Sequence, residues 1–285
     1  MTSGSLDFGP VITLTVDDCW KTHAQAFDQA FDSNSLRGVF YVVAGFVGRD
    51  VNDFQFVEWD DLRQMSEEGQ EIGSHSFTHR GSVLGLTTKA AQLFRLVRSK
   101  GLVRSTRLTR ALLRLPEEYP GTHLQPDEEV SLSKLEIEKE LERPCKSYSY
   151  PGGEPTPAVM KIARDRGYTS ARTIRPGFNN MHNFEPYALK SQVWDRWTSA
   201  RVANKWVDKA IRRNLWLIEV FHAINLPHYP YSCSESSLKE HLSYIHFRRS
   251  EIDNLTVSET IERIRRNLLS ESLIQTLSCA SDQFI

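Results

Sequence analysis

Short apolar runs alternate with longer stretches of mixed character along most of the chain. Residues 11–16, 36–43 and 215–221 are rich in valine, isoleucine, leucine and phenylalanine, which is typical of strands buried on both faces. The stretches between such runs have helical character, and glycine ends two of them at Gly69 and Gly167. The expected strands cover residues 11–16, 36–43, 71–74, 145–150, 189–194 and 215–221, and the expected helices cover residues 21–31, 58–68, 127–142, 155–166 and 200–213.

The alternation of strands and helices predicts a mostly parallel sheet within an α/β domain. A chain of 285 residues with 40% hydrophobic content can bury one large core, and no clear linker divides it. Asp17, His75, Pro151 and His222 lie at or just after the ends of expected strands. In a β/α barrel the carboxyl ends of the strands form the catalytic face, so these residues are candidates for one site.

Two histidines four residues apart, His75 and His79, are the most informative chemical feature. On one helical turn they would share a face, so both imidazoles could reach a single cation. The acidic pair Asp17 and Asp18 ends an apolar run much earlier in the chain. One carboxylate beside two imidazoles completes a metal site with open positions, and the second carboxylate stays free as a base. This combination favours a hydrolase, although a non-haem iron oxygenase uses the same ligand types.

The composition of the chain mainly excludes classes of partner and of structure. The 35 basic and 36 acidic residues balance, which gives no general attraction to nucleic acid or membrane and predicts no nucleic-acid partner. The four cysteines show no Cys-x-x-Cys spacing, so neither a zinc knuckle nor a disulfide scaffold is expected. The chain shows no secretory signal pattern and no apolar run near the ~20 residues of a membrane span. A soluble cytoplasmic protein is therefore expected.

Four short motifs follow one another along residues 11–222. The first is Thr15-Val-Asp-Asp-Cys-Trp20 and the second is His75-Ser-Phe-Thr-His79. The third is Tyr148-Ser-Tyr-Pro-Gly-Gly153 and the last is Leu217-Ile-Glu-Val-Phe-His222. In sequence and order they resemble the motifs of the polysaccharide deacetylases, carbohydrate esterase family 4, which share the NodB homology domain.

The resemblance implies a distorted (β/α)7 barrel that hydrolyses N-acetyl, sometimes O-acetyl, groups with a bound divalent metal. It implies that Asp18, His75 and His79 bind this metal, with Zn²⁺ as the first choice and Co²⁺ or Ni²⁺ as alternatives. Asp17 would be the general base for the attacking water. His222 would be the general acid that protonates the departing amine, a task suited to an imidazole.

The third motif indicates the substrate side of the implied site. By its equivalent position in the family, the backbone N–H of Gly152, after Pro151, is a candidate oxyanion donor, with Tyr150 next to it. Trp197 could stack on a sugar ring, and packing in the core is an equal alternative.

The chain also departs from the family pattern. The third motif often holds an arginine that contacts the catalytic base, and Ser149 stands in its place here. Arg172, Arg175 or Arg196 could supply this charge from another loop, and the sequence does not choose between them. Asp195 is the candidate for the carboxylate that tunes the acid histidine, because the motif that normally carries it is not cleanly found.

An extra segment at residues 84–126 interrupts residues 1–285, which otherwise form one barrel domain. Its part at residues 89–114 holds several arginines and lysines, no acidic residue and many leucines, which predicts one or two basic amphipathic helices. The segment could bind an anionic group over the cleft, rest on an anionic membrane surface, or form a solvated cap or oligomer contact.

The sequence therefore predicts a metal-dependent deacetylase acting on an N-acetylated saccharide. The missing signal pattern and the basic insertion favour a precursor in the cytoplasm or at the inner membrane face. Two alternatives remain: a hydrolase of a non-sugar amide on the same scaffold, and a catalytically inactive saccharide-binding relative.

Overall fold

The computed structural model describes residues 8–51, 54–79 and 124–281, with side chains described as far as residue 270. Within these residues, seven parallel strands form a closed barrel, because β9 pairs back onto β1. The expected α/β class and the (β/α)7 barrel are thus confirmed. In spatial order the barrel strands are β1 (Val11–Asp18), β2 (Gly38–Val42), β5 (Glu71–Ser74), β6 (Ser147–Ser149), β7 (Ser170–Pro176), β8 (Leu189–Val193) and β9 (Trp216–Phe221).

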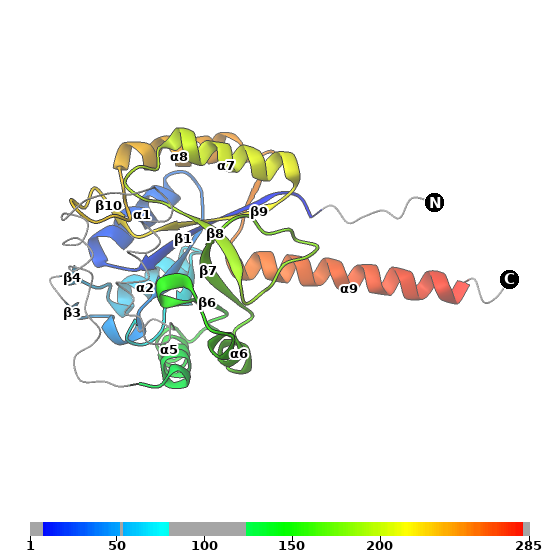
Figure 1. Cartoon of the computed structure of the whole chain (residues 1–285), viewed down its shortest axis with the longest axis horizontal. Helices are drawn as coiled ribbons and strands as arrows, with labels where there is room; N and C mark the ends of the chain where they lie inside the picture. The colour runs from blue at the N-terminus through cyan, green and yellow to red at the C-terminus, as the bar shows by residue number, and fades with distance from the viewer. Residues whose placement is uncertain (1–7, 52–53, 80–123, 282–285) are drawn as a thin grey trace.

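Helices surround the barrel, and one helix extends away from it (Figure 1). The extending helix is α9 (Val257–Ser281), which follows β12 (Asp253–Asn254). Because β12 pairs with the first residues of β1, α9 leaves the barrel at the end opposite Asp17 and Asp18. None of the described helices combines the length and apolar character needed to cross a bilayer. The surrounding helices are α1 (Lys21–Asp32), α2 (Trp59–Glu67), α5 (Pro126–Leu141), α6 (Pro157–Asp165), α7 (Ala200–Arg213) and α8 (Glu235–Phe247).

Local sequence explains where several helices begin. Pro126 and Pro157 occupy the first turns of α5 and α6, where a missing N–H breaks no helical hydrogen bond. The hydroxyls of Thr156 and Ser234 accept hydrogen bonds from backbone N–H groups at the starts of α6 and α8.

The shorter elements are η1 (Ala44–Phe46), β3 (Asp50–Val51), β4 (Phe54–Gln55), η2 (Pro151–Gly153), β10 (Ala223–Ile224) and β11 (Ser232–Cys233).

The predicted elements are confirmed with boundary shifts of a few residues, but the predicted ranges include neither helices α8 and α9 nor strand β7. Its sequence Ser-Ala-Arg-Thr-Ile-Arg-Pro contains no apolar run, although residues 170–173 are fully buried. Sequence patterns therefore failed where a barrel strand carries polar side chains inward. The predicted helical insertion at residues 84–126 lies outside the described residues, except for its last residues, which begin α5.

Strand β1 separates two layers of the core. Ile12, Leu14 and Val16 pack with the helices outside the barrel, whereas Val11 belongs to the cluster inside it. The period of two therefore directs the polar residues between them, ending with Asp17, toward the barrel axis. The start of α9 joins the inner cluster and closes the barrel at its base.

A buried polar network fastens the outer helices to β9. His241 of α8 and Glu219 of β9 are both fully buried, and their Nε2 and Oε2 atoms lie 2.9 Å apart. The His241 Nδ1 atom lies 2.7 Å from Asn204 Oδ1 on α7, and the indole N–H of Trp194 donates to Glu219 over 2.9 Å. The network joins β9, which ends just before His222, to the helical layer.

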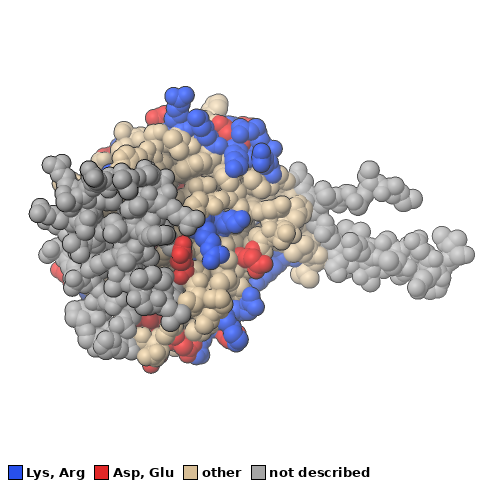
Figure 2. Space-filling model, viewed as in Figure 1, with Lys and Arg blue, Asp and Glu red and all other residues tan. Residues whose placement is uncertain are grey.

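Exposed basic residues of α7 line the upper edge of the molecule in Figure 2.

Replacing His241 by alanine should destabilise the fold strongly, because the Glu219 carboxylate then stays buried without its partner. We expect the free energy of unfolding to fall by about 3–5 kcal/mol. Urea denaturation of the wild type and of His241→Ala measures this difference. The matched control is Lys239→Ala on the same helix, which breaks an exposed pair with Glu235 and should change stability little. Equal effects of the two substitutions would contradict the assigned importance of the buried pair.

Candidate metal centre and active site

Strand β1 brings two adjacent carboxylates to the carboxyl end of the barrel. Asp17 continues the inward alternation of the strand, but the next residues, Asp18 and Cys19, have left-handed φ values of 66° and 57°. The Cys19 N–H donates to the Asp17 carbonyl over 2.8 Å and closes a tight turn. As a result, Asp17 and Asp18 both approach one imidazole, with carboxylate oxygens 3.9 and 3.6 Å from His75 Nε2.

The two histidines lie in a loop, so the expectation that they share a helical turn is wrong. β5 ends at Ser74, and the chain then passes through left-handed conformations at Ser76 (φ 67°) and His79 (φ 59°). The His75 N–H still donates to the Val42 carbonyl over 2.8 Å, which continues the pairing of the strand by one residue. The left-handed residues reverse the chain, and this reversal, rather than helical spacing, brings the imidazoles together.

Asp18, His75 and His79 form a set of ligand atoms that lie within 4.8 Å of one another. Asp18 Oδ1 is 3.2 Å from His79 Nε2 and 3.6 Å from His75 Nε2. Tetrahedral zinc bonds of about 2.0–2.1 Å separate neighbouring ligand atoms by about 3.3 Å, so these spacings fit one ion. The His75 Nδ1 atom lies 2.8 Å from the Ser149 carbonyl oxygen and must donate to it. This bond leaves the Nε2 lone pair directed at the ion position, as metal-binding histidines require.

Burial and neighbouring charges act against each other in this site. Burial lowers the pKa of His75 to about 4, which keeps its imidazole neutral and able to bind a cation near neutral pH. Burial also acts to raise the pKa of Asp18, but the His79 imidazole outweighs it and lowers the pKa below its usual range. For Asp17, burial acts to raise the pKa, but Arg172 and the nearby imidazoles outweigh it, and the pKa is lowered. Both carboxylates are therefore ionised.

Arg172 supplies the charge that the third motif lacks. Its Nη2 donates to both carboxylate oxygens of Asp17 over 2.5 Å and to Ser149 Oγ over 2.6 Å, and all three residues are buried. Ser149 and Arg172 are direct register partners on the parallel strands β6 and β7. The small serine leaves room for the arginine of the neighbouring strand. Of the three candidates from the sequence, Arg175 and Arg196 are exposed.

His222 lies beside Asp17, with 3.8 Å between its Nε2 and a carboxylate oxygen. Tyr231 stacks against its ring at 5.1 Å between centroids and 29° between planes. Burial lowers the pKa of His222, although Asp17 and Asp18 act in the other direction. The sequence candidate Asp195 does not reach it: the His222 Nδ1 has no hydrogen-bond partner among the described residues. Asp195 instead accepts a hydrogen bond from the N–H of Trp197 within its own turn.

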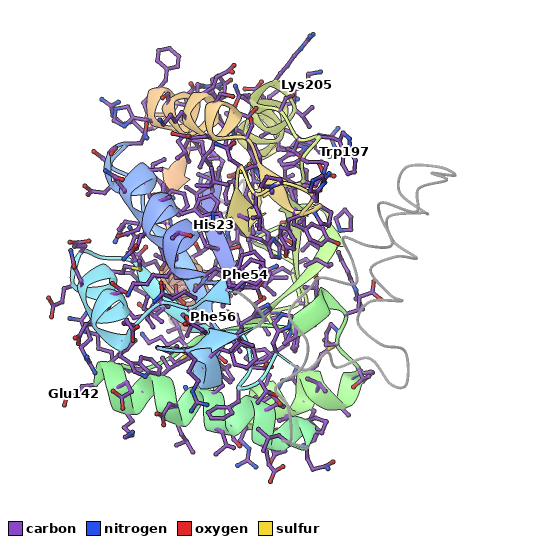
Figure 3. The ribbon with its side chains drawn as sticks, turned by 90° about the vertical axis from the view of Figure 1, so that its left-hand side faces the viewer. His23, Phe54, Phe56, Glu142, Trp197 and Lys205 are labelled. Atoms are coloured by element: carbon purple, nitrogen blue, oxygen red, sulfur yellow. The ribbon has the colours of Figure 1, made fainter. Side chains whose placement is uncertain are left out.

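The residues predicted on the substrate side lie in different environments. The Tyr150 side chain belongs to the outer core, where its hydroxyl donates to the Tyr187 carbonyl, and its N–H donates to the Arg172 carbonyl. It therefore contributes no side chain to the site. Pro151 and Gly152 belong to the 3-10 turn η2, which Tyr150 separates from the end of β6, and Gly152 has a φ of 69°. Trp197 follows β8, is 52% exposed and lies toward the periphery of Figure 3.

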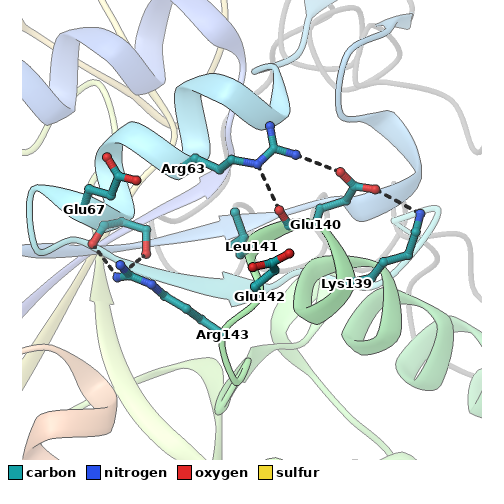
Figure 4. A pocket seen from close by; sticks show the side chains of 8 residues that line it. Arg63, Glu67, Lys139, Glu140, Leu141, Glu142 and Arg143 are labelled. Carbon is teal, nitrogen blue, oxygen red and sulfur yellow. Dashed lines mark hydrogen bonds and ion pairs between the residues drawn. The ribbon is translucent and has the colours of Figure 1, made fainter.

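A second concave feature lies apart from this site. A polar groove of about 640 Å³ opens between the ends of α2 and α5 (Figure 4). Arg63 donates to the carboxylate of Glu140 over 2.9 Å, and Arg143 donates to the Ser66 carbonyl over 3.1 Å, so charged residues bridge it. None of the candidate site residues lines this groove.

Comparison with known sequences shows a family match. The family model described as polysaccharide deacetylase matches residues 8–171 of this chain. This segment includes the first three motifs and both histidines. No curated protein matches the chain.

Comparison with solved structures shows similar folds at low sequence identity. A T48 deacetylase with substrate is 14% identical at a TM-score of 0.51, covering 90% of this chain and 94% of that one. A mutant of BA3943, described as a CE4 family pseudoenzyme with restored enzymatic activity, is 13% identical at 0.51, covering 90% and 69%. IcaB from Ammonifex degensii is 19% identical at 0.41; the match spans 57% of this chain and 59% of that one.

The ligand geometry predicts that the protein binds one zinc ion per chain. Replacing His79 or Asp18 by alanine should weaken zinc binding by more than about 100-fold, because loss of an outer partner alone costs about 10- to 100-fold. Isothermal titration of the metal-free protein with zinc measures both values. His182→Ala, which removes an exposed histidine, should bind zinc like the wild type. Wild-type affinity in His79→Ala would contradict the proposed ligand set.

Proposed function

Because the chain belongs to the polysaccharide deacetylase family, whose model matches residues 8–171, we propose that it is a metal-dependent enzyme that removes N-acetyl groups from a saccharide. The family makes it a hydrolase acting on amide bonds. The metal requirement, the saccharide and the leaving group are the parts that the proposal adds.

The observation that carries the proposal is the separation of two adjacent carboxylates into different tasks. Asp18 lies 3.2 Å from His79 Nε2, in the ligand set. Asp17, one residue earlier, is held by the Arg172 guanidinium over 2.5 Å and belongs to no ligand set that the described residues form. A buried, ionised carboxylate with no ligand role, next to a metal position, is what a general base needs.

Asp18, His75 and His79 would hold a divalent ion, with zinc as the first choice and cobalt or nickel as alternatives. Such an ion polarises a bound carbonyl group and makes water more acidic. The three side chains supply one anionic and two neutral ligands, so the charge of the ion is only partly neutralised. The remaining positive charge favours the developing oxyanion of an amide under attack.

Asp17 takes a proton from the attacking water at a carboxylate oxygen. Arg172 contributes by keeping this carboxylate ionised and fixed in direction despite its burial. The water oxygen then bonds to the acetyl carbon. The Oδ2 atom of Asp17 lies 3.9 Å from His75 Nε2 and 3.8 Å from His222 Nε2, so we assign the proton transfer to this oxygen.

His222, in its protonated form, donates a proton from Nε2 to the amine nitrogen as the carbon–nitrogen bond breaks. Its position 3.8 Å from Asp17 puts acid and base on neighbouring sides of the substrate carbon. The products are acetic acid, which ionises to acetate, and the free amine, and transfer of the proton from Asp17 back to His222 restores both residues. We assign the oxyanion contact of the protein to the N–H of Gly152, which lies in η2 three residues after β6 ends.

One observation favours a second candidate, a saccharide-binding protein without activity. The Nδ1 atom of His222 has no partner among the described residues, so the acid histidine lacks a carboxylate behind it. The similar BA3943 protein is described as a pseudoenzyme of this family. Hydrolysis of a non-sugar amide remains the other alternative. A cytoplasmic or membrane-face substrate rests on the sequence alone and stays a prediction.

The proposal predicts acetate release that depends on Asp17. Zinc-loaded wild type should release acetate from at least one member of a panel of N-acetylated sugar nucleotides, lipid-linked sugars and oligosaccharides. Asp17→Asn should bind zinc with wild-type affinity but lose at least about 100-fold in kcat, the usual share of a general base. Asp32→Asn, an exposed change of the same kind on α1, should keep full activity.

The outcomes separate the candidate functions. Saccharide binding without acetate release in both wild type and Asp17→Asn would favour the inactive binding protein. Turnover of a non-sugar amide with indifference to acetylated sugars would favour the other hydrolase. Full activity in Asp17→Asn would remove the assigned base.

The arginine contact predicts a rescue across two strands. Arg172→Ser should lower kcat on the order of 100-fold, the effect of a displaced catalytic group, with a smaller change in KM. Adding Ser149→Arg returns a guanidinium from the register partner on β6 and should recover much of the lost kcat. Arg175→Ser, an exposed arginine of the same strand, is the control. No loss in Arg172→Ser would contradict the role given to this contact.

A further inference from the structure

The loop that carries both histidines is held from two sides. On one side, the N–H groups of Ala44 and Gly45 in η1 donate to the carbonyls of Ser76 over 3.1 Å and of Phe77 over 2.9 Å. The approach is so close that a Cβ atom at Gly45 would lie 2.5 Å from the Phe77 carbonyl oxygen. On the other side, N–H groups of the loop turn toward a single buried carboxylate, that of Glu129.

Glu129 lies near the start of α5 and is 4% exposed. Its Oε2 accepts the N–H of Phe77 over 3.0 Å and that of Thr78 over 2.8 Å, and its Oε1 accepts the Thr78 hydroxyl. Three hydrogen bonds from one loop compensate for the burial of this charge. The neighbouring Glu128 accepts the Gln125 N–H over 2.7 Å and thereby caps the helix. Capping of α5 therefore does not need Glu129.

The bonds of Glu129 act on the backbone directly before a ligand. Thr78 precedes His79, whose φ of 59° is a conformation that residues other than glycine seldom adopt. Such a conformation persists only when surrounding contacts impose it. The hydrogen bonds from Phe77 and Thr78 to Glu129 are such contacts.

We propose that Glu129 is a positioning residue of the metal centre, which fixes the direction of the His79 imidazole by holding the two backbone N–H groups before it. This inference rests on the proposed function, because it requires Asp18, His75 and His79 to bind a divalent ion. Groups behind a ligand commonly set the affinity of a metal site. Here Glu129 acts on the backbone that precedes His79 and makes no bond to the imidazole itself. Without it, the loop relaxes and the 3.2 Å approach of His79 to Asp18 is lost.

The test compares zinc affinity in variants of the metal-free full chain by isothermal titration. Glu129→Ala should bind zinc about 10- to 100-fold more weakly. Glu129→Gln should keep most of the affinity, because its amide oxygen can accept the same two N–H groups. The matched control is Glu136→Ala on the same helix, whose carboxylate pairs with Lys139 at 3.5 Å and should not affect zinc binding. The absorption spectrum of bound Co²⁺ should change in Glu129→Ala alone.

Circular dichroism and thermal unfolding of the metal-free variants show whether each is folded. A folded Glu129→Ala with wild-type zinc affinity would overturn the inference, and so would an equal loss in Glu129→Gln. Where Glu129→Ala does not fold, Thr78→Val decides, since it removes only one of the three hydrogen bonds. It should lose affinity to a smaller extent, and unchanged affinity would overturn the inference. A wild type that binds no zinc would instead refute the proposed function.

Discussion

The contact on which the site depends is the buried ion pair between Arg172 and Asp17. A carboxylate that is 2% exposed would be neutral without compensation, and a neutral acid cannot act as a base. The Arg172 guanidinium provides this compensation over 2.5 Å and itself lies over the Tyr41 ring at 5.3 Å. The same charge keeps Asp17 apart from the ligand set formed by Asp18 and the two histidines. One interaction thus separates the proposed base from the proposed metal ligands.

The position of that arginine shows how a barrel can supply a charge from either of two neighbouring strands. Neighbouring parallel strands bring register partners side by side, so a side chain from β7 can occupy the space that one from β6 would fill. The small side chain of Ser149 leaves room for Arg172 and accepts a hydrogen bond from it. Its backbone carbonyl, which any residue would supply, separately holds the His75 imidazole.

Rigid supports surround the reacting groups on several sides. The loop with His75 and His79 is hydrogen-bonded to η1 on one side and to Glu129 on the other. These bonds offset the energetic cost of its left-handed backbone conformations. The Nδ1 atom of His222 has no hydrogen-bond partner among the described residues, but Tyr231 stacks on its ring. Tyr231 contacts Tyr229, which packs edge-on against Trp20, two residues after Asp18. Backbone bonds therefore orient the ligands, and aromatic packing orients the proposed acid.

The sequence by itself determined the alternation of strands and helices, the barrel class and the residues that meet at the strand ends, because these follow from local periodicity and short motifs. It misjudged the histidine loop as helical, since spacing alone does not reveal left-handed residues. Only the tertiary structure chose Arg172, which lies 155 residues from Asp17, and excluded Asp195 as the partner of His222. It also revealed Glu129, 51 residues from Thr78. Such contacts depend on strand register and on which buried polar groups need partners, and no local pattern encodes either.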